Sequence, residues 1–164
     1  MLQEPGYTHL VVKAVIVGCG RVGSVLAREL AAAGHDVTVV DTSRASFDRL
    51  GSHFPGRMVL GNGIDQHVLE EAGAPAADWF VSVTNGDNRN IMSAQIAKEI
   101  FKIPRVMTRI YDPIREAVYR EMGLYTYCPT LVGAAIARTY FEQGPEAADQ
   151  ARSELTGSLV ASLG

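Results

Sequence analysis

Blocks of hydrophobic and polar residues along the chain predict a strand followed by a helix, repeated several times. Residues 10–17 form an almost unbroken run of aliphatic and β-branched side chains, which is typical of a strand buried on both faces. From residue 21 to residue 33 the apolar positions recur every three or four residues, which predicts an amphipathic helix. Gly34 supplies the stop. The first unit is therefore a strand, a turn and a helix.

The later blocks repeat this order. The expected strands are 36–40, 57–60, 79–83, 105–109 and 125–128, and the expected helices are 44–50, 66–72, 88–102, 114–122 and 130–143. This alternation predicts an α/β fold, a Rossmann-like, doubly wound sheet of six parallel strands in three layers, α/β/α. We expect the domain to span 10–143, with a leader at 1–9. Residues 144–164 are rich in Ala, Ser and Gly with weak periodicity, so we expect a tail or linker there.

The ends of the expected strands carry glycines or polar residues. These are Gly18, Asp41, Gly61, Thr84, Arg109 and Cys128. In a parallel sheet the carboxyl ends of the strands share one edge, which is where such folds bind ligands. The sequence therefore predicts a ligand site at this edge.

The turn after the first strand carries a dinucleotide-binding glycine pattern. It reads Gly18, Cys19, Gly20, Arg21, Val22, Gly23. Gly18 permits a tight turn, Gly20 lets the backbone approach a pyrophosphate, and Gly23 lets helix and strand pack closely. The helix N-terminus adds about half a positive charge toward the phosphates, and Arg21 adds a cation there.

Asp41 follows the second strand, where a carboxylate accepts hydrogen bonds from the hydroxyls of an adenosine ribose and repels a 2′-phosphate. This favours NAD(H), ATP or ADP over NADP(H), although Arg44 softens that discrimination. Thr42 and Ser43, between these two residues, are included in the expected site. The alternative is that the glycines only make a tight turn and Asp41 only caps the next helix.

Composition narrows the class of protein. The chain has 164 residues, of which 47% are hydrophobic, and a formal net charge of −3. The length and the hydrophobic content are enough for one folded domain and leave little room for a separate substrate domain. The net charge gives no sign of a basic surface that would bind nucleic acid. Neither a signal peptide nor a membrane-spanning run is recognisable, so we expect a soluble protein. Two cysteines indicate a reducing compartment, and Cys19 and Cys128 should lie about 14 Å apart, too far for a disulfide.

Several residues have two interpretations. Asp87 and Asn90 flank the start of a helix, so capping, with Asp87 as the N-cap, competes with ligand contact. Arg109 either points into the cleft or forms a surface salt bridge. Cys19 is either a small loop residue or a redox-sensitive thiol whose pKa the helix N-terminus and Arg21 lower. The four histidines lack the spacing of a zinc site, and no metal site is expected.

Motifs beyond the glycine loop carry a family resemblance. They are Gly20-Arg21-Val22-Gly23, Gly34-His35-Asp36-Val37 with Val40-Asp41, Gly61-Asn62-Gly63 through Leu69-Glu70-Glu71-Ala72-Gly73, Ala77-Asp78, Thr84-Asn85-Gly86-Asp87-Asn88-Arg89-Asn90, Thr108-Arg109, and Gly123 with Pro129. From about residue 13 to residue 143 the chain resembles the RCK N-terminal domain, also called TrkA-N or KTN, of Trk- and Ktr-type potassium uptake regulators.

The resemblance implies a non-enzymatic regulator that binds NAD(H) or ATP/ADP and gates a membrane potassium channel or transporter by conformational change. It implies a homodimer or larger ring, contacts through the late helices, and a cytoplasmic place at the membrane through the partner. By the same resemblance, Arg21 reaches a terminal phosphate, in its own or the neighbouring subunit, and Asn62 and Gly63 line the adenine pocket. The site also takes in the turn of Thr84, Asn85 and Gly86, near the distal phosphate or second nucleoside, and Arg109 as a further cation.

Two departures from the family pattern matter. Asn62 stands where many relatives have Asp, and Thr130 follows Pro129 where some have an acidic cation ligand, which argues against a carboxylate metal site. Two alternatives to the regulator stay open: a fragment of an NAD-dependent oxidoreductase, and a redox sensor acting through Cys19.

Overall fold

A six-stranded parallel sheet forms the centre of the computed structural model, which describes residues 10–156. The strands are β1 (Lys13–Val17), β2 (Asp36–Asp41), β3 (Arg57–Leu60), β4 (Trp79–Ser82), β5 (Arg105–Arg109) and β6 (Tyr125–Tyr127). Their order is β3-β2-β1-β4-β5-β6, and every neighbouring pair is parallel. The predicted doubly wound sheet is confirmed. The expected leader at 1–9 lies outside the described residues.

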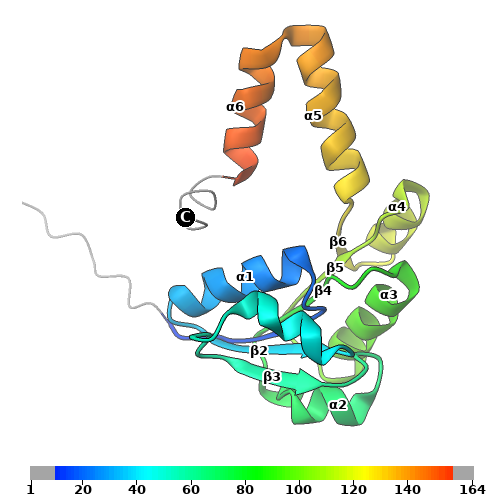
Figure 1. The fold of residues 1–164 in the computed structure, drawn as a ribbon. Helices are drawn as coiled ribbons and strands as arrows, with labels where there is room; N and C mark the ends of the chain where they lie inside the picture. Colours follow the sequence, from blue (N-terminus) through cyan, green and yellow to red (C-terminus); the bar gives the residue numbers. More distant parts are fainter. Residues whose placement is uncertain (1–9, 157–164) are drawn as a thin grey trace, which may run out of the picture.

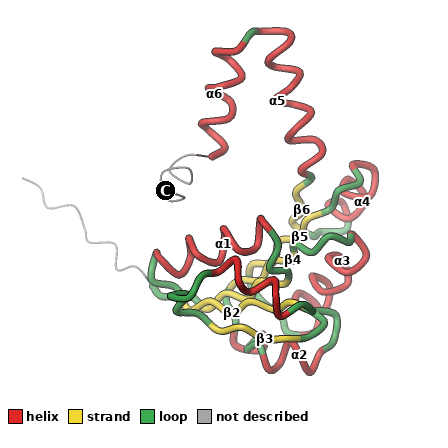
Figure 2. Tube along the Cα trace, in the orientation of Figure 1, coloured by secondary structure: helices red, strands yellow, loops and turns green. Residues whose placement is uncertain are grey.

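Helices cover both faces of this sheet (Figures 1 and 2). They are α1 (Arg21–Ala32), the 3₁₀ helix η1 (Arg44–Leu50), α2 (Gln66–Glu71), the 3₁₀ turn η2 (Ala74–Ala76), α3 (Asp87–Gln95), the π-helical turn η3 (Ile96–Ile100), α4 (Pro113–Glu121), α5 (Pro129–Gln143) and α6 (Pro145–Thr156). In Figure 1, α1 lies above the sheet and α2 lies below it. The arrangement is the expected three-layer α/β/α sandwich.

Two hydrophobic cores hold the layers together because successive strand residues point to opposite faces. Val15 and Val17 of β1 pack with Leu69 of α2 on one face. Ile16 of β1 packs with Ala27 of α1 on the other face. The continuous apolar run of the first strand is therefore explained by burial on both sides.

The predicted helix at 88–102 differs from the structure in its second half. The α-helical pattern ends at Gln95, and a π-helical turn follows, with the Phe101 N–H donating to the Ile96 carbonyl over 3.2 Å. Lys102 then adopts a positive φ of 55° and closes the segment. Ala97, within the π turn, lies in the same core as Val15.

A second difference concerns the expected tail. Residues 145–156 form α6, which contacts α5 in an antiparallel hairpin that projects away from the sheet (Figure 1). The sequence suggested a tail because its apolar periodicity is weak, and the structure explains that weakness: Ala148 is the buried residue of α6. Residues 157–164 lie outside the described part of the chain.

Candidate functional site

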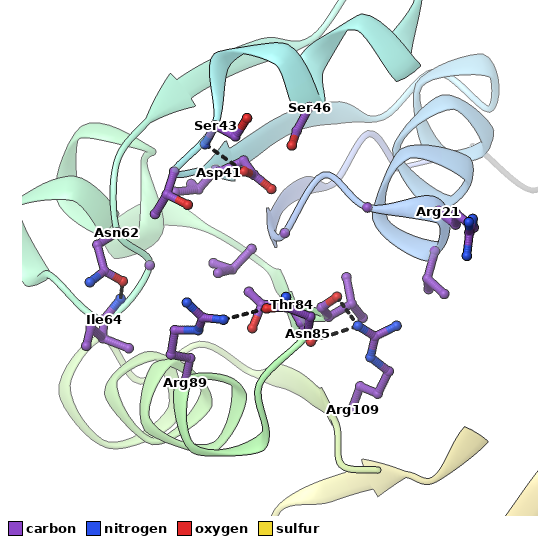
Figure 3. A pocket seen from close by; sticks show the side chains of 18 of the residues that line it. Arg21, Asp41, Ser43, Ser46, Asn62, Ile64, Thr84, Asn85, Arg89 and Arg109 are labelled. Carbon is purple, nitrogen blue, oxygen red and sulfur yellow. Dashed lines mark hydrogen bonds between the residues drawn. The ribbon is translucent and has the colours of Figure 1, made fainter. Parts of the chain in front are cut away.

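A cleft of about 520 Å³ opens at the carboxyl edge of the sheet, above β1 and β4 (Figure 3). The chain leaves β1 toward β2 and leaves β4 toward β5, so the connections run in opposite directions at this point. Such a switch point is where open α/β sheets bind their ligands. The cleft therefore lies where the strand-end residues predicted it.

The glycine loop forms one wall, and its three glycines have different requirements. Gly18 has a φ of +105°, and a Cβ there would lie 2.9 Å from the Thr84 nitrogen. A Cβ on Gly23 would lie 1.8 Å from the Gly18 carbonyl oxygen. Both positions therefore need glycine for the fold itself. Gly20 instead borders the cleft, and a Cβ there would have no atom of the described residues within 4 Å.

Gly20 is also the N-cap of α1, and no side chain caps this helix. The first N–H groups of a helix lack partners within the helix, so they are available to an anion beside the loop. Arg21 follows at the rim of the cleft, and its side chain points away from Asp41 and Thr84 (Figure 3).

Asp41 ties two loops together at the end of β2. Its carboxylate accepts hydrogen bonds from the Cys19 N–H at 2.7 Å and the Ser43 N–H at 2.8 Å. The residue also lines the cleft. Asp41 therefore holds the glycine loop against the β2–η1 turn while leaving the second lone pair of each oxygen for other donors.

Cys19 lies beneath the loop and does not line the cleft. The side chain is fully buried, and its thiol donates to the Ser46 carbonyl at 3.3 Å. Burial raises the pKa of the Cys19 thiol to about 11, with a further increase from Asp41 and a smaller opposing effect of Arg49. The lowered pKa that the redox-sensor alternative requires is therefore not found, and the structure favours the other interpretation, that Cys19 is a small residue of the loop. Cys19 and Cys128 are both free thiols, and β1 and β6 lie three positions apart, as predicted.

Arg109 supplies a buried cation at the opposite wall. Its side chain, 7% exposed, donates to the carbonyls of Val83 at 2.6 Å and Thr84 at 2.7 Å. The guanidinium also lies 4.6 Å from the centre of the Tyr111 ring. Its Nε has no hydrogen-bond partner. The residue lines the cleft, so the alternative of a surface salt bridge is wrong.

Asn90 and Asp87 build the site rather than cap a helix. The Asn90 side-chain oxygen accepts from the N–H and hydroxyl of Thr84, and its amide nitrogen donates to the carbonyls of Thr84 and Arg109, all within 2.7–3.0 Å. Asp87 is the first residue of α3, and its carboxylate accepts from the N–H groups of Tyr111 and Asp112. The Asn90 side chain thus fastens the turn after β4 to the end of β5, and Asp87 fastens α3 to the loop after β5.

Most residues of the expected site line the cleft, and four do not. Those on the cleft are Gly18, Gly20, Arg21, Val22, Asp41, Thr42, Ser43, Asn62, Gly63, Thr84, Asn85 and Arg109. The four others are Cys19, Gly23, Arg44 and Gly86. Cys19 and Gly23 are buried behind the loop, Gly86 lies beneath the Arg89 side chain, and Arg44 is an exposed residue at the start of η1.

Sequence reasoning missed several polar side chains that line the cleft. They are Ser46, Arg49, Arg89 and Tyr111. Ser43, Ser46 and Arg49 are three residues apart, and a 3₁₀ helix places such positions in one row. A 3₁₀ assignment of residues 44–50 would therefore have found two of them.

The cleft is rich in positive charge although the whole chain has a net charge of −3. Four arginines line it, at positions 21, 49, 89 and 109, together with the single carboxylate of Asp41. Within residues 10–156, no Asp or Glu carboxylate lies within 4.0 Å of these four guanidinium groups. Such a site suits an anion that also carries a hydroxyl-rich group for Asp41.

The remaining groups of the described chain do not add a metal centre. No cluster of three or more His, Cys, Asp or Glu side chains able to hold an ion occurs among residues 10–156. Within the same range, no helix is long and apolar enough to span a membrane.

Curated proteins with similar sequences are potassium uptake proteins. The chain is 52% identical over 112 residues to the Trk system potassium uptake protein TrkA of Streptomyces coelicolor, which is 68% of this chain and 50% of that protein. It is 34% identical over 110 residues to a TrkA homolog of Methanothermobacter thermautotrophicus, covering 67% of this chain and 50% of the homolog. The chain therefore spans about half the length of these relatives.

Solved structures share the fold. The TrkA-N domain of the Escherichia coli inner membrane protein ybaL matches with a TM-score of 0.67 and 26% identity, over 82% of this chain and 98% of that one. The AMP-bound Kef CTD of Shewanella denitrificans matches with a TM-score of 0.69 and 22% identity, over 92% and 95%. The GsuK channel bound to NAD matches with a TM-score of 0.63 and 19% identity, over 79% and 24%.

The family resemblance predicted from the sequence motifs is confirmed by a family model as well as by the fold. The TrkA-N domain model matches residues 14–128, which include the whole glycine loop and all six strands except Lys13, the first residue of β1. The chain therefore belongs to the TrkA-N domain family.

Proposed function

We propose that this chain is a nucleotide-sensing regulatory unit of potassium transport. It binds an adenine nucleotide, NAD(H) or ATP/ADP, in the cleft at the carboxyl edge, and ligand-dependent changes in its shape gate ion flux through a membrane partner. The family, the potassium uptake relatives, and fold neighbours named with AMP and NAD support this proposal.

The observation that carries the proposal is the open space above Gly20. The fold itself needs glycine at positions 18 and 23, but no atom of the described residues requires it at position 20. A glycine there is explained if a phosphate approaches the backbone at van der Waals distance. The uncapped N-terminus of α1 beside it provides the donors such a phosphate needs.

The rest of the cleft fits the other parts of an adenine nucleotide. Asp41 accepts the ribose hydroxyls, and Asn62 and Gly63 line the adenine side, next to β3. Thr84, Asn85 and Arg109 face the phosphates from the opposite side. These assignments place the base over β2 and β3 and the phosphates over β1 and β4.

We infer that the chain acts by binding, without making or breaking a bond. Asn90 and Asp87, which do not line the cleft, hold the fold on the phosphate side: Asn90 makes four hydrogen bonds to Thr84 and Arg109, and the Asp87 carboxylate accepts from two N–H groups. The side chains that do line the phosphate side, Thr84, Asn85, Arg89 and Arg109, include no carboxylate. This arrangement agrees with the family's regulatory role.

The partner we propose is a membrane potassium channel or transporter subunit, reached from the cytoplasmic side by a homodimer or larger ring of this chain. The late helices provide the subunit contacts. Ile114 and Val118 of α4 and its C-cap residue Met122 form an exposed apolar stripe, and α5 has no buried residue in the single chain. These faces are too apolar to be left to solvent without a partner.

Isothermal titration calorimetry with NAD⁺, NADH, ATP, ADP and cyclic di-AMP tests the proposal. Gly20→Ala should lower the affinity for the nucleotide at least about ten-fold, because the added Cβ takes the place of the phosphate. The same substitution should change the free energy of unfolding by less than about 1 kcal/mol. Gly133→Ala is the matched control, since Gly133 also has open space at its Cβ and lies on α5, outside the cleft. Failure of the wild-type chain to bind any adenine nucleotide, or unchanged affinity in Gly20→Ala, contradicts the proposal.

A further inference from the structure

The cleft has two halves of different charge. On the β2 and β3 side its charged groups are Asp41 and Arg49, so a carboxylate and a guanidinium stand together. On the β4 and β5 side they are Arg89 and Arg109, with no carboxylate among the lining residues. The second half is therefore the more cationic one.

Arg89 is held across this second half by its own loop. It lies in the first turn of α3, and its Nη2 donates to the Asn85 side-chain oxygen (Figure 3). A Cβ placed on Gly86 would lie 3.3 Å from both Nε and Nη2 of Arg89, so the guanidinium extends over the Gly86 backbone. Glycine at this position gives the arginine room to lie along the wall of the cleft.

Arg109 provides a second, independent sign of an anion on the same side. It is more than nine-tenths buried, lines the cleft, and has an Nε without a partner. Figure 3 shows Arg89 and Arg109 on opposite sides of Thr84 and Asn85. The exposed guanidinium of Arg89 and the buried one of Arg109, without a carboxylate partner among residues 10–156, make this half of the cleft positive and suit it to an anionic ligand.

We propose that Arg89 is a specificity-determining residue that selects a nucleoside diphosphate or triphosphate over a dinucleotide. This inference rests on the proposed function, because it assumes that adenosine lies on the Asp41 side. A terminal phosphate then meets Arg89 and Arg109 and gains charge-assisted hydrogen bonds. A dinucleotide brings the same two phosphates, but its second phosphate is a diester with less negative charge than the terminal phosphate of ADP, and its second nucleoside has to fit into the same half. NAD⁺ additionally brings a positively charged pyridinium ring close to two cations.

The order of affinities follows from these charges. ATP and ADP bind more tightly than NADH, whose second ring is neutral, and NADH binds more tightly than NAD⁺. Arg89 contributes to this order through its charge, because its hydrogen bond to Asn85 requires only an N–H donor. Glutamine retains such a donor and removes the charge, and lysine retains the charge without the planar fork.

Calorimetric titration of ADP, ATP, NADH and NAD⁺ into the wild-type chain, Arg89→Gln and Arg89→Lys tests this. Arg89→Gln should lower the affinities for ADP and ATP about ten-fold, because a charged partner of the terminal phosphate is lost. The same substitution should change the affinity for NAD⁺ by less than about two-fold. Arg89→Lys should retain most of the preference for ADP. Arg28→Gln removes the same charge from an exposed position of α1 outside the cleft, and should change none of the affinities.

The ratio of the affinity for ADP to the affinity for NAD⁺ is the decisive measurement. If Arg89 only held the fold, Arg89→Gln would lower both affinities by the same factor. A ratio that is the same in wild type and Arg89→Gln overturns the assignment of Arg89 while leaving the proposed function intact. Wild-type binding of NAD⁺ more tightly than ADP also overturns it. Absence of binding by all four nucleotides overturns the proposed function together with this inference.

Discussion

Some residues around the cleft hold its loops in place and others line it, and Asn90 is the clearest case of the first kind. It is fully buried, and its four side-chain hydrogen bonds satisfy three backbone groups of Thr84 and Arg109 and the Thr84 hydroxyl, near the ends of two strands. Backbone groups buried without partners are costly. The position of Arg109 in the cleft therefore depends on an amide that no ligand touches.

Asn90→Ala should lower the free energy of unfolding by about 2–4 kcal/mol, because it leaves several buried donors and acceptors without partners. Urea denaturation followed by circular dichroism measures this change. Asn88→Ala serves as the control: Asn88 is an exposed amide on the same helix, bonded to Arg115 at the surface, and should cost less than about 0.5 kcal/mol. Equal losses in the two variants would contradict the role assigned to Asn90.

Cys19 makes the stability of the fold sensitive to alkaline pH. Its pKa is raised from 9.0 to about 11, chiefly by burial, so the folded state favours the neutral thiol. The sign follows from linkage: the contribution is complete below the unfolded pKa, and it is lost as the pH rises from about 9 through about 11. At neutral pH the thiol is protonated and unreactive.

Urea unfolding of the wild-type chain and Cys19→Ala at pH 8 and pH 10.5 measures this contribution. The stability advantage of the wild type over Cys19→Ala should shrink between the two values, because only the wild type has to bury a group that ionises in the unfolded state. Iodoacetamide should alkylate native Cys19 slowly at pH 8. Rapid alkylation there, or an advantage that grows with pH, would contradict the raised pKa.

Residues that line the cleft could be predicted from the sequence where they stand at strand ends, and were missed where they stand on helices. Asp41 and Arg109 follow from strand boundaries, because parallel strands bring their carboxyl ends to one edge. Arg49 and Arg89 lie within helices, and which face of a helix borders a cleft depends on how the helix packs. The burial of Cys19 and the bonds of Asn90 likewise depend on contacts between distant segments.

At the level of elements, the boundaries followed closely from local signals. Asp112 accepts hydrogen bonds from the N–H groups of Ile114 and Arg115, and Pro113 begins α4, as the residue types predicted. Gly34 and Gly73 adopt positive φ values where helices end. Capping and stop signals are local, so the sequence alone contains them.

The elements that the sequence missed lack such signals. The π-helical turn η3 has no distinct residue pattern, since it differs from an α-helix only by one extra residue per turn. Helix α6 buries little apart from Ala148, so no apolar stripe marks it. Both elements depend on packing between segments, which the periodicity of apolar residues does not predict.

At the scale of the whole molecule, the hairpin of α5 and α6 has no hydrophobic core of its own. Helix α5 has no buried residue and α6 buries Ala148, and the hairpin they form projects from the domain (Figure 1). Leu131 and Tyr140 of α5 are exposed, and Phe141 is 84% exposed. Large apolar side chains gathered on an isolated helix indicate a surface that is covered in an assembly.

We therefore expect the chain to sediment as a dimer or larger ring, and Leu131→Glu with Phe141→Glu to shift it to a monomer, because the two carboxylates would be buried without partners in the interface. Neither side chain belongs to the two hydrophobic cores. The two substitutions should therefore change the free energy of unfolding of the monomer by less than about 1 kcal/mol, as expected for exposed positions. Gln143→Glu adds a charge to an exposed position at the end of the same helix and should preserve the assembly. Sedimentation velocity at several protein concentrations separates these outcomes. A wild-type chain that remains monomeric, or a double variant that assembles like the wild type, would show that the apolar face of α5 is not a subunit contact.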